Sequence, residues 1–383
     1  IRVSLDDSNL DGAPLLYTEG GVLANTCPPN ATVSLFHDNR LWLAGTEDDR
    51  IWLSRRMVPD EGPSFHPLLT IDPFEGGRVR AMGSLTDKVI LFKEDSCFFL
   101  FGEGPDDRGV GSTLSDPELL SSDVGCTNPR SVATTSLGLF FQSTNGAPYL
   151  VTPTLQVVPI GKDVEDAIAG LTVADAVLCQ DAQELHVYLR DSNIRLVLDL
   201  LHSAPDAPVW SVDTLPTEAS AGCVHRGVST FVSNDTTPRV LKEDKTTNLD
   251  CAYGETSGAY PSLFFKSGWI APVGRQGWYR VKELGLMLRR DGEHQCEVTV
   301  ARDYDESTAY AFQFSSFEMG FDLGPSRLYS VTPPVQKCTA VQVTYDDTQA
   351  GYYSDGSGSV LEGLTLLVEP MDRMARRAKE MVK

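Results

Sequence analysis

LFHDNRLWLAGTEDDRIWLSR, residues 35–55, is the stretch that decides how the rest of the chain is interpreted. It predicts a β-hairpin, because two segments rich in aromatic and aliphatic residues flank the polar turn 46–49. The first strand is expected to begin at Arg40 and the second at Arg50. The hairpin is therefore the unit with which later parts of the chain are compared.

The same hairpin pattern recurs four more times. The hairpins open at about Arg40, Lys88, Gly138, Glu184 and Gly227. Successive openings are 43 to 50 residues apart, and no segment with helical periodicity separates them. A period of this length built from strands is typical of a β-propeller. Residues 31–255 are therefore predicted to form a β-propeller in which five blade-like repeats are visible.

The inner strands of these repeats are expected to be buried, because VILF, GLFF and VYL are almost continuously apolar. Trp42 and Phe140 are predicted core residues on this ground. Only residues 163–169, DVEDAIA, suggest a helix, of about two turns, with acidic residues at its start as the helix dipole favours. The fold class predicted for the chain is thus mainly β.

The chain is strongly acidic. Among its 383 residues, 32 Lys and Arg stand against 53 Asp and Glu, which gives a formal net charge of −21. A protein that wraps nucleic acid needs clustered cations to neutralise phosphates, so this composition argues against that class. A surface past which DNA moves without binding is still allowed.

Cysteine and histidine usage gives no sign of a metal site. The eight cysteines are dispersed without a CxxC pair, and they are expected to be buried, reduced thiols. The six histidines never approach the spacing of zinc ligands. Paired acids such as Asp48-Asp49 and Asp106-Asp107 are expected to be solvated turn residues, with calcium ligation as the alternative. No metal and no cofactor is predicted.

The remaining chain divides into three parts. Residues 1–30 are expected to be an extended segment, either the end of an upstream region or a strand that closes the ring. Residues 256–370 lose the repeat and show longer alternating strands, which predict a β-sandwich. The expected sandwich strands are 263–271, 278–289, 296–304, 309–317, 339–345 and 360–368. No apolar run is long enough to cross a bilayer.

Residues 371–383, MDRMARRAKEMVK, predict an amphipathic C-terminal helix with its apolar residues on one face. This helix is basic in an otherwise acidic chain. It could pack on its own domain, dock on a neighbouring acidic subunit or lie on a membrane surface. The candidate partner interface consists of its basic residues, Arg373, Arg376, Arg377 and Lys379.

No arrangement of residues predicts an enzyme. The segment from Ser121 to Asn128, SSDVGCTN, resembles the Asp-box turn of sialidase-type propellers, but Asn128 stands where that motif has an aromatic residue. The motif is a folding device, and it occurs once. The sequence contains no GxGxxG, Walker loop, HExxH or GxSxG motif. No catalytic residue is therefore predicted.

Beyond these motifs, the chain resembles the nozzle or hub proteins, which are tubular, propeller-containing proteins at the distal end of the tail of short-tailed bacteriophages. The similarity covers most of residues 20–370. It lies in RLWLAG followed by RIWLSR and in the segments 83–93, 123–132, 137–146, 267–270, 277–281, 301–305 and 336–341. Proteins of this family usually continue upstream of the propeller, so the start of this chain departs from the pattern.

The resemblance implies a structural role in the virion. A hexameric ring is expected below the portal and adaptor, bounding the DNA ejection channel and meeting the tail fibres, with double-stranded DNA passing through without specific binding. The acidic balance predicts a channel lined more by Asp and Glu than by Lys and Arg. The alternatives are a cell-surface β-propeller that binds or hydrolyses glycans and a cellular scaffold propeller.

Overall fold

The computed structural model describes residues 21–59, 62–243, 250–251, 258–259, 263–272, 277–290, 295–315, 324–335, 337–347 and 359–371. The chain divides into two compact units, residues 1–243 and residues 244–383. Most of the expected N-terminal extended segment and nearly all of the C-terminal helix, with its four basic residues, lie outside the described residues. Within the described part of the chain, none of the helices has the length and apolarity that a membrane span needs.

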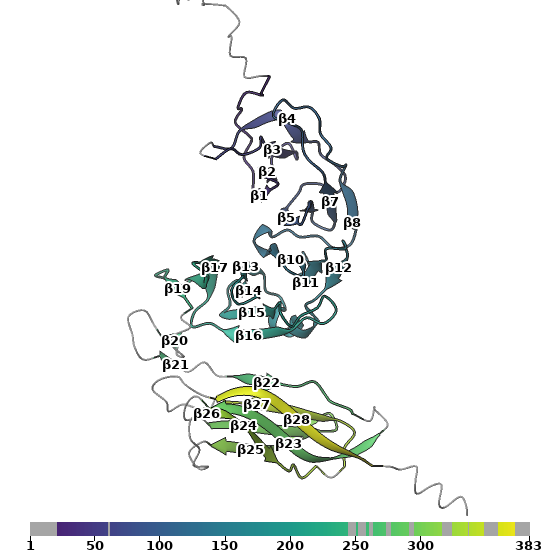
Figure 1. Ribbon diagram of the computed structural model, residues 1–383, viewed down its shortest axis with the longest axis vertical. Helices are drawn as coiled ribbons and strands as arrows, with labels where there is room; N and C mark the ends of the chain where they lie inside the picture. Colours follow the sequence, from purple (N-terminus) through teal and green to yellow (C-terminus); the bar gives the residue numbers. More distant parts are fainter. Residues whose placement is uncertain are drawn as a thin grey trace, which may run out of the picture. The chain divides into compact units, whose positions relative to one another are not determined.

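The first unit contains five antiparallel sheets that follow one another in chain order (Figure 1). Four have four strands and the fifth has three, and every strand pairs with its neighbours in sequence. The strands are β1 Val33–His37, β2 Arg40–Ala44, β3 Ile51–Ser54, β4 Phe65–Ile71; β5 Ala81–Leu85, β6 Lys88–Phe92, β7 Cys97–Phe101, β8 Glu118–Ser121; β9 Ala133–Thr135, β10 Gly138–Gln142, β11 Pro148–Val151, β12 Val157–Pro159; β13 Val173–Cys179, β14 Glu184–Leu189, β15 Ile194–Asp199, β16 Trp210–Thr214; β17 Ala219–His225, β18 Val228–Ser233 and β19 Val240–Lys242.

The five predicted hairpins are confirmed as pairs formed by the second and third strands of each sheet. In the first pair, Trp42 lies opposite Leu53, and the same arrangement recurs in β6–β7, β10–β11, β14–β15 and β18–β19. The second strands are largely buried, as expected, and Trp42 and Phe140 are 2% and 0% exposed. In the second, third and fourth sheets the second strand lies between two others and has a neighbouring sheet on each face, which explains why both of its faces are apolar.

Helical structure is shorter than the sequence predicts. The 3₁₀ helices η2 Pro129–Ser131 and η3 Lys162–Val164 and the α-helix α1 Glu165–Ile168 are the helical elements of the described residues. The expected helix over residues 163–169 is therefore one 3₁₀ turn followed by one α-turn. Its Val164 and Ile168 pack into the core between the third and fourth sheets, which holds the segment in place despite its length.

Each sheet of the first unit shares a buried apolar core with the next sheet. Val33 and Trp42 pack with Met82 of the second sheet, and Ile90 of that sheet packs with Phe141 of the third. Similar clusters join the third sheet to the fourth and the fourth to the fifth. First strands of successive sheets also contact each other, in the order β1, β5, β9, β13 and β17. The sheets therefore stack face against face.

The second unit is also built from antiparallel strands. Strands β20 Asp250–Cys251 and β21 Gly258–Ala259 form a short pair. One larger sheet has the order β22-β27-β24-β25 and the other the order β26-β23-β28. These strands are β22 Phe264–Lys266, β23 Trp278–Arg290, β24 Gln295–Arg302, β25 Asp305–Ser315, β26 Gly324–Val331, β27 Val341–Asp346 and β28 Ser359–Met371. Tyr279, Val298 and Tyr345 belong to one core shared by the two larger sheets.

Three details differ from the sequence prediction. The strand expected over residues 263–271 is limited to β22, Phe264–Lys266. Strand β26 was not expected, since residues 324–331 do not alternate clearly between polar and apolar. The strand expected over residues 296–304 ends at Arg302, because Asp303 and Tyr304 adopt positive φ angles of 54° and 65° and turn the chain into β25. The turn determines both the end of β24 and the start of β25. The alternation of polar and apolar residues does not predict where such a turn lies.

The expectation that all cysteines are buried is wrong for two of them. Cys27 and Cys223 are exposed. Among the cysteines whose burial the structure describes, the buried free thiols are Cys97, Cys126, Cys179, Cys296 and Cys338. Cys223 lies on β17, a strand whose residues are mostly half-buried or exposed, so a position within a strand did not guarantee burial.

Candidate functional site

The Asp-box-like segment serves a structural purpose here. It follows β8 and leads into η2, where the Asn128 side chain accepts from the Arg130 amide and donates to the Val173 carbonyl oxygen at 2.6 Å. A Cβ at Gly125 would meet the backbone carbonyl oxygens of Lys93 and Glu94. Glycine is thus required for the close approach of this segment to the β6–β7 turn, where the Cys126 amide donates to the Lys93 carbonyl.

A hydrogen-bonded group of seven polar side chains lies between the fourth and fifth sheets. We call it the His186 cluster, and it comprises Cys179, Glu184, His186, Tyr188, Arg195, Asp213 and Ser229. Strand β14 supplies Glu184, His186 and Tyr188 from one face. The intervening Leu185, Val187 and Leu189 point to the other face and join the core with the third sheet.

Distances within the cluster define a continuous hydrogen-bonded chain. Ser229 Oγ lies 2.9 Å from His186 Nδ1 and 2.7 Å from the Tyr188 hydroxyl. On the other side of the ring, His186 Nε2 lies 3.0 Å from Glu184 Oε2. Arg195 Nη1 lies 3.3 Å from His186 Nδ1, while its Nη2 donates to Asp213 Oδ2 at 2.6 Å.

These distances determine which ring nitrogen of His186 carries the hydrogen. Arg195 has only donors, so Nδ1 of His186 must be the unprotonated ring nitrogen and must act as an acceptor. Nε2 therefore carries the hydrogen and donates to Glu184. The Ser229 hydroxyl donates to Nδ1 of His186, and its oxygen accepts from the Tyr188 hydroxyl. The neutral histidine thus fits its surroundings, whereas a protonated ring would point a second N–H at the Arg195 guanidinium.

Burial and charge agree with this assignment. Burial, followed by the Arg195 charge, lowers the pKa of His186 despite the nearby Glu184. Burial raises the pKa of Tyr188 and of the Cys179 thiol, so both keep their protons. Although burial disfavours its charge, the carboxylate of Asp213 raises the pKa of Arg195. The cluster therefore holds one ion pair, Arg195 with Asp213, beside a histidine, a tyrosine and a thiol that are neutral.

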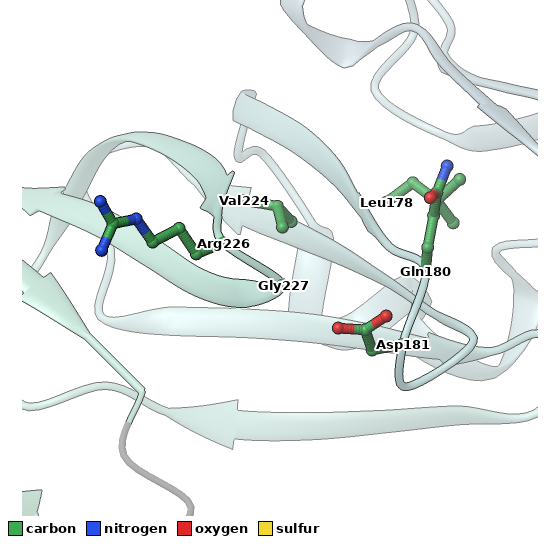
Figure 2. Close-up of a pocket in the computed structure, with 6 residues that line it drawn as sticks. All are labelled: Leu178, Gln180, Asp181, Val224, Arg226 and Gly227. Carbon is green, nitrogen blue, oxygen red and sulfur yellow. The ribbon is translucent and has the colours of Figure 1, made fainter.

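A shallow hollow of about 420 Å³ opens close to the cluster, where the β13–β14 and β17–β18 turns meet. It is lined by Leu178, Gln180, Asp181, Val224, Arg226 and Gly227. Figure 2 shows the Arg226 guanidinium pointing away from the Asp181 carboxylate. The two opposite charges thus do not converge on a ligand position, and the hollow lacks the deep apolar lining typical of a small-molecule site.

The order Ser229, His186, Glu184 is that of a nucleophile, a base and an orienting carboxylate. Catalysis would need a substrate to reach Ser229, but this residue is only 4% exposed and its hydroxyl already has two partners. The arrangement is suited instead to hold the fourth and fifth sheets together. Buried polar networks whose members are all paired make such an interface rigid.

The described residues contain no group of three or more His, Cys, Asp or Glu side chains placed to hold a metal ion. The His186 cluster was not predicted from the sequence. The signal that could have found it is the alternation ELHVYL over residues 184–189, where polar and ionisable side chains replace apolar ones on one face only. That pattern predicts a polar contact on that face, but not its partner on β18.

Comparison with known proteins gives little further guidance. No family model and no curated protein matches the chain. Two solved structures of an exo-β-1,3-galactanase from Phanerochaete chrysosporium, one with galactose and one of a variant with β-1,3-galactotriose, are similar over 90% of this chain and 100% of their own. Their TM-score is 0.30 and their sequence identities are 8% and 9%. A likeness at this level carries no conclusion about this chain.

Proposed function

We propose that the chain is a structural component of a bacteriophage short tail, a nozzle or hub ring that forms part of the DNA ejection channel and a platform for neighbouring tail proteins. In this proposal the five sheets of the first unit are blades of a β-propeller, and the two larger sheets of the second unit form a β-sandwich. The protein acts in the virion, as a homo-oligomer and without catalysis. The sequence resemblance to nozzle proteins supports this assignment.

The observation that carries a structural role is that polar side chains, exposed at Thr134, half-buried at His37 and buried at Gln142, link each sheet of the first unit to its neighbour. The His37 ring lies 2.8 Å from Ser84 Oγ, joining the first and second sheets. Thr134 donates to the Ser84 carbonyl at 2.7 Å, joining the second and third. Gln142 donates to the Leu171 carbonyl and accepts from the Val173 amide, joining the third and fourth.

These links favour a rigid building block. The His186 cluster completes the series between the fourth and fifth sheets. A ring forms from heterologous contacts that close by rotation, and it closes reproducibly only if each subunit keeps its shape. The acidic composition adds support, since a wall of negative charge would let a duplex pass without counterion release.

The mass of the assembled protein tests the proposal. We expect native mass spectrometry of the purified chain, alone and with the tail adaptor of its phage, to give a ring of several copies, with six as the expected number. Negative-stain images should then show a central channel. A chain that stays monomeric in both samples, and that binds or cleaves bacterial polysaccharide, would contradict the tail role and favour the glycan-directed alternative.

A further inference from the structure

The interface between the fourth and fifth sheets differs from the other sheet interfaces of the first unit. Among the described residues its apolar core is the smallest, and its buried members are Ala174, Tyr188, Leu215, Ala219 and Phe231. Two of these are alanines, which bury little apolar surface. In contrast, leucine, valine and phenylalanine side chains fill the core between the third and fourth sheets. Polar contacts therefore account for a larger share of the interface between the fourth and fifth sheets.

The His186 cluster is divided unequally between these two sheets. Six of its seven members lie on strands of the fourth sheet, and these are Cys179, Glu184, His186, Tyr188, Arg195 and Asp213. The seventh, Ser229, lies on β18 of the fifth sheet. The hydrogen bonds from Ser229 to His186 and Tyr188 thus cross the interface. Separation of the sheets would break these two bonds and leave the pairs within the fourth sheet intact.

The Nδ1 side of the His186 ring faces a cation. Arg195 Nη1, from β15, lies 3.3 Å from Nδ1, and the Cys179 thiol, from β13, lies 3.5 Å from it. The remaining neighbour on this side is the Ser229 hydroxyl of β18. A proton added at Nδ1 would place a second positive charge beside a guanidinium that is only 13% exposed, where water screens the repulsion poorly. The Ser229 hydroxyl could then no longer donate to Nδ1.

The Nε2 side compensates only in part for a charge on the ring. Glu184, on the same strand as His186, lies 3.0 Å from Nε2, but its side chain is 38% exposed and water weakens its attraction. The carboxylates of Asp213 and Glu243 are paired with Arg195. Burial, followed by the Arg195 charge, therefore lowers the pKa of His186. A ring that reaches water recovers its ordinary affinity for a proton.

We propose that the interface between the fourth and fifth sheets is an acid-sensitive joint, at which protonation of His186 releases the fifth sheet while the first four sheets stay packed. His186 lies on β14, which pairs with β13 and β15, so the ring cannot leave without unfolding the fourth sheet. Ser229 lies on the last sheet of the row, β17-β18-β19, which is the part that can move (Figure 1). Water then replaces Ser229 beside the ring.

Release of the fifth sheet affects the connection to the rest of the chain. The chain passes from this sheet into the second unit at residue 244. Once the fifth sheet is free, the covalent connection between the first four sheets and the second unit is longer. The joint does not depend on the tail role proposed above.

Hydrogen exchange followed by mass spectrometry locates the opening. The full chain is compared at pH 7.5 and pH 5.5, with rates corrected for the intrinsic pH dependence of amide exchange. We expect the protection of residues 219–233 to fall about tenfold, because a freed histidine with a pKa of about 6.5 is about ten times more often protonated than neutral at pH 5.5. Residues 138–151 of the third sheet should keep their protection. Equal losses in both segments, or no loss in residues 219–233, would overturn the proposal.

Two variants test whether His186 is the responsible group. His186→Gln keeps a donor and an acceptor but does not titrate, so the protection of residues 219–233 should no longer depend on pH. His37→Gln is the matched control, because His37 is the histidine that links the first and second sheets through Ser84. It should retain the tenfold change in residues 219–233. A change that persists in His186→Gln, or that disappears in His37→Gln, contradicts the joint, and the wild-type comparison decides the matter even if His186→Gln does not fold.

Discussion

At the scale of single residues, His186 shows how one buried side chain can connect two sheets. It accepts on one ring nitrogen, donates on the other and is only 2% exposed. Its nearest charged neighbours are Glu184 on its own strand and Arg195 on β15. The positive charge of Arg195 is paired with the carboxylates of Asp213 on β16 and Glu243 after β19.

We expect this histidine to make the protein less stable in mild acid. Its pKa is lowered in the folded state, so below the ordinary value of about 6.5 the unfolded chain takes up a proton that the folded chain refuses. The contribution of neutral His186 to the free energy of unfolding is present above pH 6.5 and is lost as the pH falls toward the pKa of His186 in the folded protein. Thermal unfolding between pH 7.5 and pH 5 measures it.

The matched variant is His186→Gln, which keeps a donor and an acceptor but does not titrate. Its Tm should fall less steeply with decreasing pH than that of the wild type, although it starts lower. Carboxylates with lowered pKa values, such as Asp48 and Asp199, titrate in both proteins and cancel in the difference. Parallel pH profiles for the two proteins would show that His186 is not the titrating group.

At the scale of elements, the second strand of each sheet has the largest structural role. Strand β10 is buried along its whole length, with Phe140 in the core toward the fourth sheet and Phe141 in the core toward the second. Adjacent residues of one strand thus hold two different interfaces. A change at either position is expected to loosen one interface without directly touching the other.

Phe140→Ala should lower the free energy of unfolding of the first unit by about 3 to 5 kcal/mol, because a buried phenylalanine is lost and a cavity remains. Urea unfolding followed by tryptophan fluorescence measures the change, since Trp210 packs against Phe140 with ring centroids 6.3 Å apart. Phe36→Ala is the control, because Phe36 is 59% exposed on β1 and should cost about 0.5 kcal/mol or less. Equal losses for the two variants would contradict this account of the interfaces.

At the scale of the whole molecule, charge is distributed unevenly along the sequence. The chain carries a net charge of −21, yet its last residues are basic. Opposite charges attract over about 8 to 10 Å at ordinary ionic strength, so this basic segment favours contact with an acidic neighbour such as a second copy. DNA, in contrast, would meet a predominantly acidic protein.

Replacing Arg373, Arg376, Arg377 and Lys379 with Glu should therefore weaken ring assembly or docking to a neighbouring tail protein while each subunit stays folded. Sedimentation velocity and circular dichroism check the two parts of this expectation. The control is a variant with the same change in net charge at exposed basic residues of the first unit, Lys162, Arg226, Arg239 and Lys242. Normal assembly of the reversed protein, or retardation of DNA by the wild type at physiological salt, would contradict the proposed role of these charges.

The sequence by itself determined the strands and their repetition. Apolar runs such as GLFF and VYL predicted the buried second strands, and the polar turns between them predicted the hairpins, because both signals depend on residues close together in the chain. Strands β1 and β26 were less visible, since β1 is only partly buried and the residues of β26 do not alternate clearly between polar and apolar.

Only the tertiary structure decided which polar residues meet. His186 and Ser229 lie on different sheets and 43 residues apart, so no local pattern joins them. The need for Gly125 is likewise invisible in sequence, because it arises from the backbone of Lys93 and Glu94. Strand formation follows from local preference and periodic burial, whereas polar pairing and close approach depend on how sheets pack, and that is fixed only when the whole unit folds.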